Sequence, residues 1–270
     1  MPSSGSGPIT TCEDRKVIGD VLASDLRLRD PPVQISYLNT APLPGAPRAP
    51  ALPSVCSYFI EGGRRALSAS REDHEACEIG AFVHGIEPQG PLGDRLSRTV
   101  GWMEGVGYLA QGEAGRVPHN DTAPAWSLYA PLGAVPEEPS VVLFRVDARA
   151  AMLVVEATSR GLPGLPPAPL LPRPMCSLVP VLLKGAPVAL SFGCAGSRVH
   201  TGMGDDELLV GVRGDALMEL ADTVHTLVAA NEKVWKEDLA RRSKLLEGTA
   251  ERAKAPSLRR KAGGPTPKRA

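Results

Sequence analysis

Aromatic side chains are scarce in this chain of 270 residues, which contains only 4 Phe, 4 Tyr and 3 Trp. A hydrophobic core must therefore be built mainly from Leu, Val and Ala. Excess charge of either sign is absent as well, because 30 Lys and Arg residues balance 30 Asp and Glu residues. Without a net charge there is no global field to attract nucleic acid, so we do not expect a nucleic-acid partner.

Export signals and a disulfide framework are also missing. The N-terminal residues show no charged stretch followed by an apolar one, and no apolar run marks a membrane span. The five cysteines are odd in number, which does not favour a set of paired disulfides. We therefore expect a cytoplasmic protein with reduced thiols and no membrane association. Motifs of phosphate-binding loops, serine hydrolases and zinc proteases are absent too, so hydrolases of those types are not expected.

Strand-like and helical stretches alternate along the chain, which predicts an α+β fold. Apolar and β-branched residues indicate strands at 33–38, 126–130, 141–146, 187–192 and 207–212. We expect a mixed sheet of about five strands with helices packed on it. A broad apolar stripe after Gly214 predicts a long C-terminal helix that starts at Asp215.

The two ends of the chain differ from the rest in composition. Residues 1–14 are rich in Ser, Gly, Thr and Pro, and residues 252–270 contain seven Lys or Arg and no acid. Neither end has enough periodic apolar surface to offset the entropy of ordering. We therefore expect a disordered N-terminal tail over 1–14, a single α+β domain over 15–251 and a disordered basic tail over 252–270.

The stretch from Pro187 to Arg213 concentrates chemically active side chains. An apolar strand ends at Gly193-Cys194-Ala195-Gly196, and a second strand starts at Glu207. The interpretation as one β-turn-β unit would place the thiol of Cys194, the guanidinium of Arg198 and the carboxylate of Glu207 close together. The alternative is a tight hairpin with a surface ion pair and a buried free cysteine.

Three further cysteines lie where helices are expected to begin. Ser54 can cap a helix with Cys56 in its first turn, and Cys77 and Cys176 lie in the opening turns of two others. Helix N-termini lower the pKa of a thiol, and thiolates bind soft metals and iron–sulfur clusters. Against a shared site, the spacings are long and no Cys-x-x-Cys motif is present, so the cysteines could also simply fill the core.

Several segments resemble a known family. They are Cys56-Ser-Tyr-Phe-Ile-Glu-Gly-Gly-Arg-Arg-Ala, Ala76-Cys77-Glu-Ile-Gly-Ala-Phe, Leu128-Tyr-Ala-Pro-Leu132, Val141-Val-Leu-Phe-Arg-Val-Asp147, and Ser191-Phe-Gly-Cys-Ala-Gly-Ser-Arg198 followed by Asp206-Glu-Leu208. Together they resemble the domain-of-unknown-function family 169, from about Val33 to the start of the last helix. The resemblance draws attention to the positions Cys56, Cys77, Cys176, Cys194, Arg198 and Glu207, and it supplies no reaction.

These observations lead to the hypothesis of an iron–sulfur protein. Cys56, Cys77, Cys176 and Cys194 would hold a [4Fe–4S] cluster, either all four or three of them with one iron left open. An open iron could act as a Lewis acid on a small anionic substrate bound by Arg198, Gly196 and Ser197. Glu207 would carry protons or orient Arg198. Such a protein would be an iron–sulfur-dependent lyase or redox enzyme, with an electron-transfer protein as a possible partner.

Other readings stay open at this point. Zinc is the second metal that the cysteines could bind, although scattered ligands are less typical of structural zinc than paired ones. A non-enzymatic protein could bind a small anion through Arg198 while its cysteines fill the core. An interaction protein could dock a partner on its terminal helix and attract it weakly with its basic tail.

Overall fold

The computed structural model describes residues 11–40, 46–49, 51–160, 170, 171 and 173–254, with side chains up to residue 247. The chain divides into two compact units, Met1–Val228 and Ala229–Ala270. The strands of the described part are β1 (Val33–Leu38), β2 (Leu67–Ser70), β3 (Trp126–Pro131), β4 (Val141–Val146), β5 (Leu170–Leu171), β6 (Val188–Ser191) and β7 (Leu208–Arg213).

The α-helices of the described part are α1 (Cys12–Leu26), α2 (Val55–Arg64), α3 (Arg71–His74), α4 (Glu78–Val83), α5 (Gly90–Gly105), α6 (Ala148–Ser159), α7 (Leu178–Leu183), α8 (Ala195–Thr201) and α9 (Leu217–Lys254). Short 3₁₀ turns are η1 (Ala114–Arg116), η2 (Met175–Ser177) and η3 (Gly214–Ala216). The long C-terminal helix is confirmed, and it begins after η3 rather than at Asp215.

The first unit is built on a seven-stranded sheet in the order β2-β3-β1-β4-β7-β6-β5. Neighbouring strands are antiparallel except for β5 and β6, which are parallel. The predicted α+β fold with a mixed sheet is therefore confirmed. The two unpredicted strands are the short edge strands, because β2 has only four residues and β5 only two, too few to show a period.

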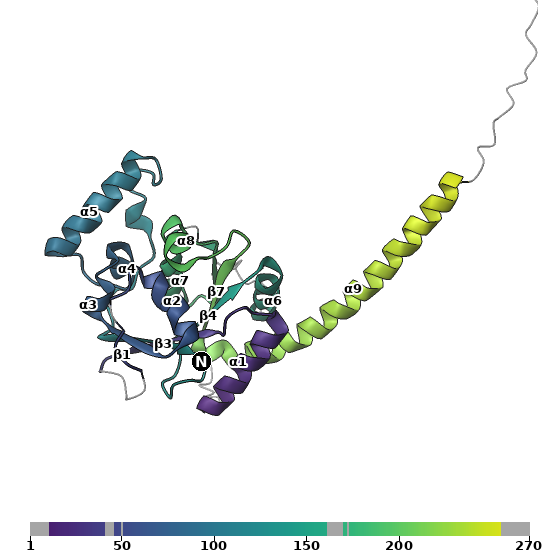
Figure 1. Ribbon diagram of the computed structural model, residues 1–270, viewed down its shortest axis with the longest axis horizontal. Helices are drawn as coiled ribbons and strands as arrows, with labels where there is room; N and C mark the ends of the chain where they lie inside the picture. The colour runs from purple at the N-terminus through teal and green to yellow at the C-terminus, as the bar shows by residue number, and fades with distance from the viewer. Residues whose placement is uncertain (1–10, 41–45, 50, 161–169, 172, 255–270) are drawn as a thin grey trace, which may run out of the picture. The chain divides into compact units, whose positions relative to one another are not determined.

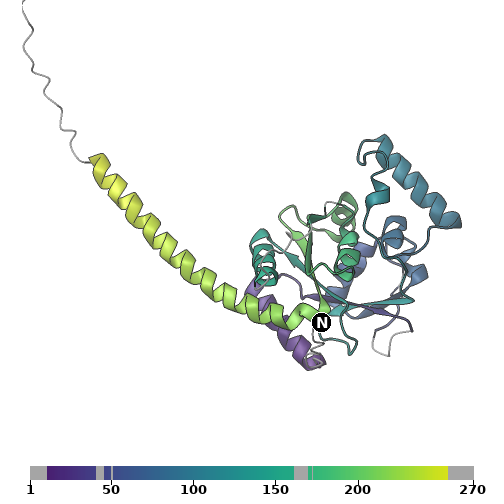
Figure 2. The same ribbon diagram turned by 180° about the vertical axis from the view of Figure 1, so that it is seen from behind.

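Strand β4 shows how the two faces of the sheet divide the core. Val142, Phe144 and Val146 face one cluster of buried side chains, together with α1, α6 and the start of α9. The intervening Val141 and Leu143 face the other cluster, with α2 and α7. Figures 1 and 2 show these helices on opposite sides of the sheet. Burying a Val or Leu side chain fully stabilises the fold by about 1.5–3 kcal/mol. The apolar side chains packed on both faces of the sheet are therefore the main source of its stability.

Strands β6 and β7 are antiparallel neighbours, but they are not joined by a simple turn. Helix α8 lies between them, so the predicted β-turn-β unit is wrong. The helix begins because Cys194 is its N-cap. The backbone N–H of Ser197 donates to Cys194 Sγ at 3.4 Å, and the Cys194 N–H donates to Ser197 Oγ at 2.8 Å. Cysteine is not among the preferred N-cap residues, so the sequence pattern hid this helix start.

The expected boundaries of the chain need two corrections. Helix α1 begins at Cys12 behind a capping box made by Thr11 and Asp14, so residues 12–14 are helical rather than part of a tail. Residues 1–10 and 255–270, which carry the rest of the two expected tails, lie outside the described residues. The single domain expected over 15–251 is divided after Val228.

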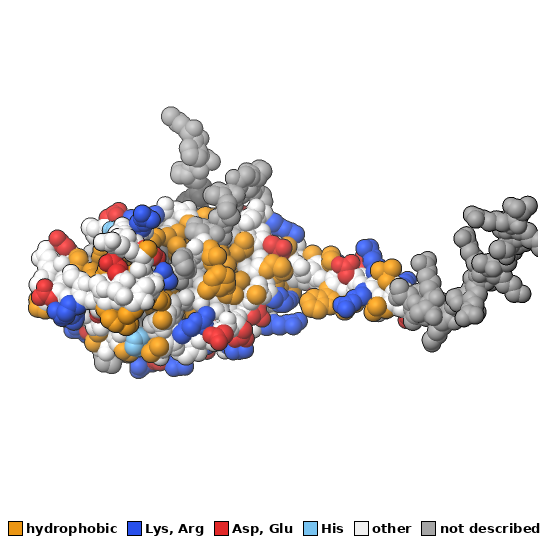
Figure 3. All heavy atoms as spheres, turned by 90° about the horizontal axis from the view of Figure 1, so that it is seen from above, with side chains coloured by type: hydrophobic (Ala, Val, Ile, Leu, Met, Phe, Trp, Pro, Cys, Tyr) orange, Lys and Arg blue, Asp and Glu red, His pale blue; other side chains and the backbone are white. Residues whose placement is uncertain are grey.

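The second unit, considered by itself, contains the part of α9 that follows Val228. Its side chains Val234, Trp235 and Leu239 are more than half exposed. Figure 3 shows hydrophobic side chains interspersed with charged ones along this segment. None of the helices in the described part of the chain is long and apolar enough to cross a membrane.

Candidate cysteine-lined site

A cavity of about 470 Å³ lies within the first unit, and all four predicted cysteine ligands line it. Cys56, Cys77, Cys176 and Cys194 reach it from the starts of α2, α4, η2 and α8. The lining continues on α5, with Leu96, Thr99, Val100 and Met103. Apolar side chains dominate the remainder, so the sulfurs share one largely apolar space.

Each of these cysteines occupies the start of a helical turn. Cys56 is the second residue of α2 and is buried, and Cys176 is buried in the 3₁₀ turn that precedes α7. Cys77 is the N-cap of α4, where its Sγ accepts the N–H of Gly80 at 3.3 Å. Cys194 caps α8 in the same way. The predicted placement of Cys56, Cys77 and Cys176 at helix starts is therefore confirmed, with Cys77 one position earlier as a cap. Cys194 was expected at the end of a strand, and the structure makes it the cap of a helix that was not predicted.

The interaction with Cys56 for Cys176, and burial for Cys77, outweigh the helix ends in setting the pKa of these two thiols. A hydrogen bond with Cys56, burial and the charges of Cys56, Cys77 and Cys194 raise the pKa of Cys176 well above its ordinary value. Burial also raises the pKa of Cys77, although N–H donors from Val55 and Gly80 act against it. The expectation of easily formed thiolates does not hold for this pair without a bound cation.

The interactions of Cys176 also show that the four sulfurs lie near one another. The thiols of Cys176 and Cys56 are hydrogen-bonded, and the charges of Cys77 and Cys194 act on Cys176. Nonetheless, within the described ranges no group of three or more His, Cys, Asp or Glu side chains is placed to hold a metal ion. The four sulfurs thus surround a common space without converging on one point.

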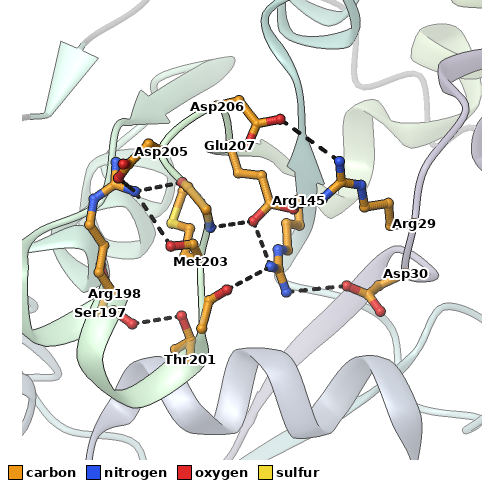
Figure 4. Close-up of polar contacts among 12 residues, drawn as sticks. Arg29, Asp30, Arg145, Ser197, Arg198, Thr201, Met203, Asp205, Asp206 and Glu207 are labelled. Carbon is orange, nitrogen blue, oxygen red and sulfur yellow. Dashed lines mark hydrogen bonds and ion pairs between the residues drawn. The ribbon is translucent and has the colours of Figure 1, made fainter.

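Arg198 lies on α8 but binds the chain next to it. Its Nη1 donates to the carbonyl of Gly204 at 2.5 Å and to Asp205 Oδ1 at 3.2 Å (Figure 4). Its Nη2 donates to the carbonyl of Phe192 at 2.8 Å. Gly196 and Ser197 line the cavity, whereas Arg198 is not among the described lining residues. In this structure the guanidinium of Arg198 holds the loop after α8 through these contacts.

Glu207 is also engaged away from the cavity. Only 5% of the residue is exposed. Its carboxylate accepts hydrogen bonds from Arg145 Nη2, from Arg29 Nη1 at 3.1 Å and from the N–H of Gly204 at 2.6 Å (Figure 4). Burial by itself would raise the pKa of Glu207, but these donors and the charges of both arginines lower it. Glu207 is therefore neither a partner of Arg198 nor a solvated turn residue.

Arg173, a cation that lines the cavity, was not singled out by the sequence analysis. Its Nη2 lies 3.2 and 3.3 Å from the two carboxylate oxygens of Glu113, and its guanidinium stacks 4.6 Å from the centre of the Tyr108 ring. Both Arg173 and Tyr108 line the cavity. The only available signal was the position of Arg173 three residues before Cys176.

Two buried histidine–tyrosine pairs lie in the core beneath α3 and α4. His74 Nδ1 faces the carbonyl of Ser70 at 2.8 Å and must donate to it, so Nε2 accepts the hydroxyl of Tyr129 at 2.9 Å. His84 Nδ1 lies 3.2 Å from the hydroxyl of Tyr37, and the two histidine rings stack with centroids 5.0 Å apart. Burial lowers the pKa of His74, and burial followed by the charge of His74 lowers the pKa of His84 further.

Unfolding should therefore become easier in mild acid. Both histidines stay neutral in the folded protein but take up protons near pH 6.5 when unfolded. Their contribution to the free energy of unfolding is therefore fully present above that pH and is lost as the pH falls below it. Between pH 7.5 and 5.5 we expect the free energy of unfolding in urea to drop by up to about 1.4 kcal/mol per histidine. His84→Gln should flatten this dependence and His119→Gln should not. An equally steep dependence in His84→Gln would contradict the assignment.

The fold and the cavity define the class of this molecule as an α+β protein with a cysteine-lined cavity. The chain belongs to the family DUF169, described as an uncharacterised ArCR, whose family model matches residues 21–223. No curated protein and no solved structure matches the chain. The matched range includes the four cavity cysteines, Arg173, Arg198 and Glu207.

Proposed function

We propose that this protein binds an iron–sulfur cluster of the [4Fe–4S] type on Cys56, Cys77, Cys176 and Cys194. One observation carries the proposal: four elements far apart in sequence each present a cysteine to the same cavity. Cubane clusters are held by four cysteine thiolates. Their ligands surround a body of several atoms, so they need not converge on one point as the ligands of a single zinc ion do.

The surroundings of the sulfurs support the same proposal. Backbone N–H groups donate to Sγ of Cys77 and Cys194, and hydrogen bonds to sulfur are among the features that set the potential of a cluster. The apolar walls from Phe82 and Val100 would limit access of water. When bound, the cluster would supply one-electron chemistry or, with three cysteines bound, a Lewis-acidic iron. The chain's own residues would place a small molecule beside it, as expected of a redox enzyme or lyase.

A second candidate is a small-molecule-binding protein without a metal. It is favoured by the contact between the thiols of Cys56 and Cys176, which belong to the hydrophobic core around α2 and α7. Buried free cysteines commonly pack as small apolar side chains. In this case the same cavity would bind its ligand without a cluster.

Purification without oxygen, followed by iron and sulfide analysis and electron paramagnetic resonance of the reduced protein, tests the proposal. We expect a brown protein with about four irons and four sulfides per chain. Cys56→Ala, Cys77→Ala, Cys176→Ala and Cys194→Ala should each lose most of the iron. Cys12→Ala is the matched control, since Cys12 donates to the carbonyl of Val135 and does not line the cavity.

The outcomes separate the two candidates. If one of the four variants keeps its iron and changes only the resonance spectrum, the cluster has three cysteine ligands and an open iron. Colourless protein that stays free of iron after anaerobic reconstitution with iron and sulfide would overturn the proposal in favour of the metal-free protein.

A further inference from the structure

We infer that the cysteine-lined cavity binds a small apolar carboxylate, with its carboxylate on Arg173 and its apolar part against α4 and α5. The inference rests on the proposed function in taking this cavity as the working site, and it names the class of ligand. Its evidence is independent of the cysteines, since it comes from the contacts of Arg173 and from the apolar walls.

The guanidinium of Arg173 is held in place with only part of its donor capacity used. Glu113 contacts Nη2, and the ring of Tyr108 supports the flat face of the group. Among the described residues, neither Nε, which is enclosed by protein, nor Nη1 has a hydrogen-bond partner. Nη1 is the donor that a ligand oxygen in the cavity would reach, and a hydrogen bond to a charged group is stronger than one between neutral groups. The planar fork favours a carboxylate over a single acceptor atom.

The acidic side chains near the cavity already have partners. Glu113 is bound by Arg173, and the hydroxyl of Thr99 donates to Glu78 Oε1 at 2.6 Å. The pKa of Glu113 is lowered first by the N–H of Ala110 and then by Arg173, so Glu113 is an anion that positions the guanidinium. Arg173 therefore remains the lining residue with charged donors available to a ligand.

The rest of the lining determines what is attached to the carboxylate. Phe82, Val100, Met103 and Leu109 face the cavity, and its volume of about 470 Å³ is at the small end of ligand pockets. A hydrophilic anion would leave these apolar side chains in contact with water or with the polar groups of the anion. An apolar chain or ring would bury them, which is favourable in proportion to the area covered.

Isothermal titration calorimetry with matched probes tests the inference. Octanoate and phenylacetate combine an apolar body with a carboxylate, 1-octanol and 2-phenylethanol lack the charge, and succinate lacks the apolar body. We expect wild-type protein to bind each apolar acid at least about tenfold more tightly than its alcohol, in keeping with a hydrogen bond to a charged group. Succinate should bind more weakly than either apolar acid.

Two variants and one control assign the charge to Arg173. Arg173→Gln should bind acid and alcohol equally, and Arg173→Lys should retain part of the preference. Arg98→Gln removes an exposed charge from α5 and should behave as wild type. Thermal unfolding of each variant shows whether it is folded. If Arg173→Gln does not fold, Arg173→Lys, which keeps the charge, provides the test.

Three results would overturn the inference: alcohols that bind as tightly as the acids, succinate that binds more tightly than octanoate, or an unchanged preference in Arg173→Gln. The titrations are made on protein with and without reconstituted iron. An apolar acid that binds through Arg173 to iron-free protein that never takes up a cluster would support this inference and refute the proposed cofactor. Protein that takes up a cluster but binds none of these acids would support the proposed cofactor and refute this inference.

Discussion

Replacing Glu207 with alanine is expected to lower the free energy of unfolding by about 3 kcal/mol, the lower end of the range for removing one partner of a buried ion pair. The side chain of Arg145 is only 17% exposed and would lose its closest acidic partner, keeping Asp30 at 3.5 Å. Arg29 is 71% exposed and would return to water at little cost. Urea unfolding monitored by circular dichroism measures the change.

The neighbouring acid provides the matched control for Glu207. The side chain of Asp205 is fully exposed and contacts Arg198 at 3.2 Å. We expect Asp205→Ala to change stability by less than about 0.5 kcal/mol. If Glu207→Ala is as stable as Asp205→Ala but loses the proposed cluster or its activity, the main role of Glu207 is at the functional site. It would then not be to join β4, β7 and the segment after α1 through ion pairs.

Replacing Gly80 with alanine should destabilise the protein by about 2 kcal/mol and disturb the cysteines. A Cβ at this position would lie against Val55 Cγ2, 2.8 Å from Val55 Cβ and 3.0 Å from Cys77 Sγ. Val55 is fully buried and cannot move aside, so α4 would have to shift away from α2. Overpacking of this kind costs about 1–3 kcal/mol, more than the helix propensity that alanine gains.

The control for Gly80 is a helical glycine with open space around it. Within the described residues, no atom outside the adjacent backbone of α5 would lie within 4 Å of a Cβ at Gly101, so Gly101→Ala should be neutral or stabilise by up to about 1 kcal/mol. Both variants are compared by urea unfolding and by iron content after anaerobic reconstitution. Normal stability and normal iron in Gly80→Ala would show that the contact of α4 with α2 does not position Cys77 for the proposed cluster.

The sequence and the structure agree where the determining contacts are local. The strand at Val141–Val146 was predicted from its apolar residues. The helix that follows begins at a cap of a preferred residue type, because the carboxylate of Asp147 accepts the N–H of Ala150 at 2.8 Å. The start of the helix that carries Cys56 was predicted for the same reason, since Ser54 Oγ accepts the N–H of Ser57 at 3.1 Å. Helix caps and the period of apolar residues depend on residues within one or two turns of each other. Both can therefore be predicted from residues that are close in sequence.

The partners of the charged residues could not be predicted in this way. Glu207 was expected beside Arg198, nine positions away, but it pairs with Arg145 and Arg29, which are 62 and 178 positions away. Arg198 follows Cys194 closely in sequence, yet the turn of α8 directs its guanidinium to Gly204 and Phe192. A spacing in sequence gives a direction in space only when the secondary structure between two residues is known.

For this protein, the sequence by itself determined the α+β class, most of the strands and the placement of Cys56, Cys77 and Cys176 at helix starts, because each of these depends on short-range patterns. Only the tertiary structure decided that the four cysteines line one cavity, and that Arg173 rather than Arg198 is the cation there. The order β2-β3-β1-β4-β7-β6-β5 brings distant segments side by side. That order results from packing both faces of the sheet at once, a condition on the whole chain that no single stretch of sequence expresses.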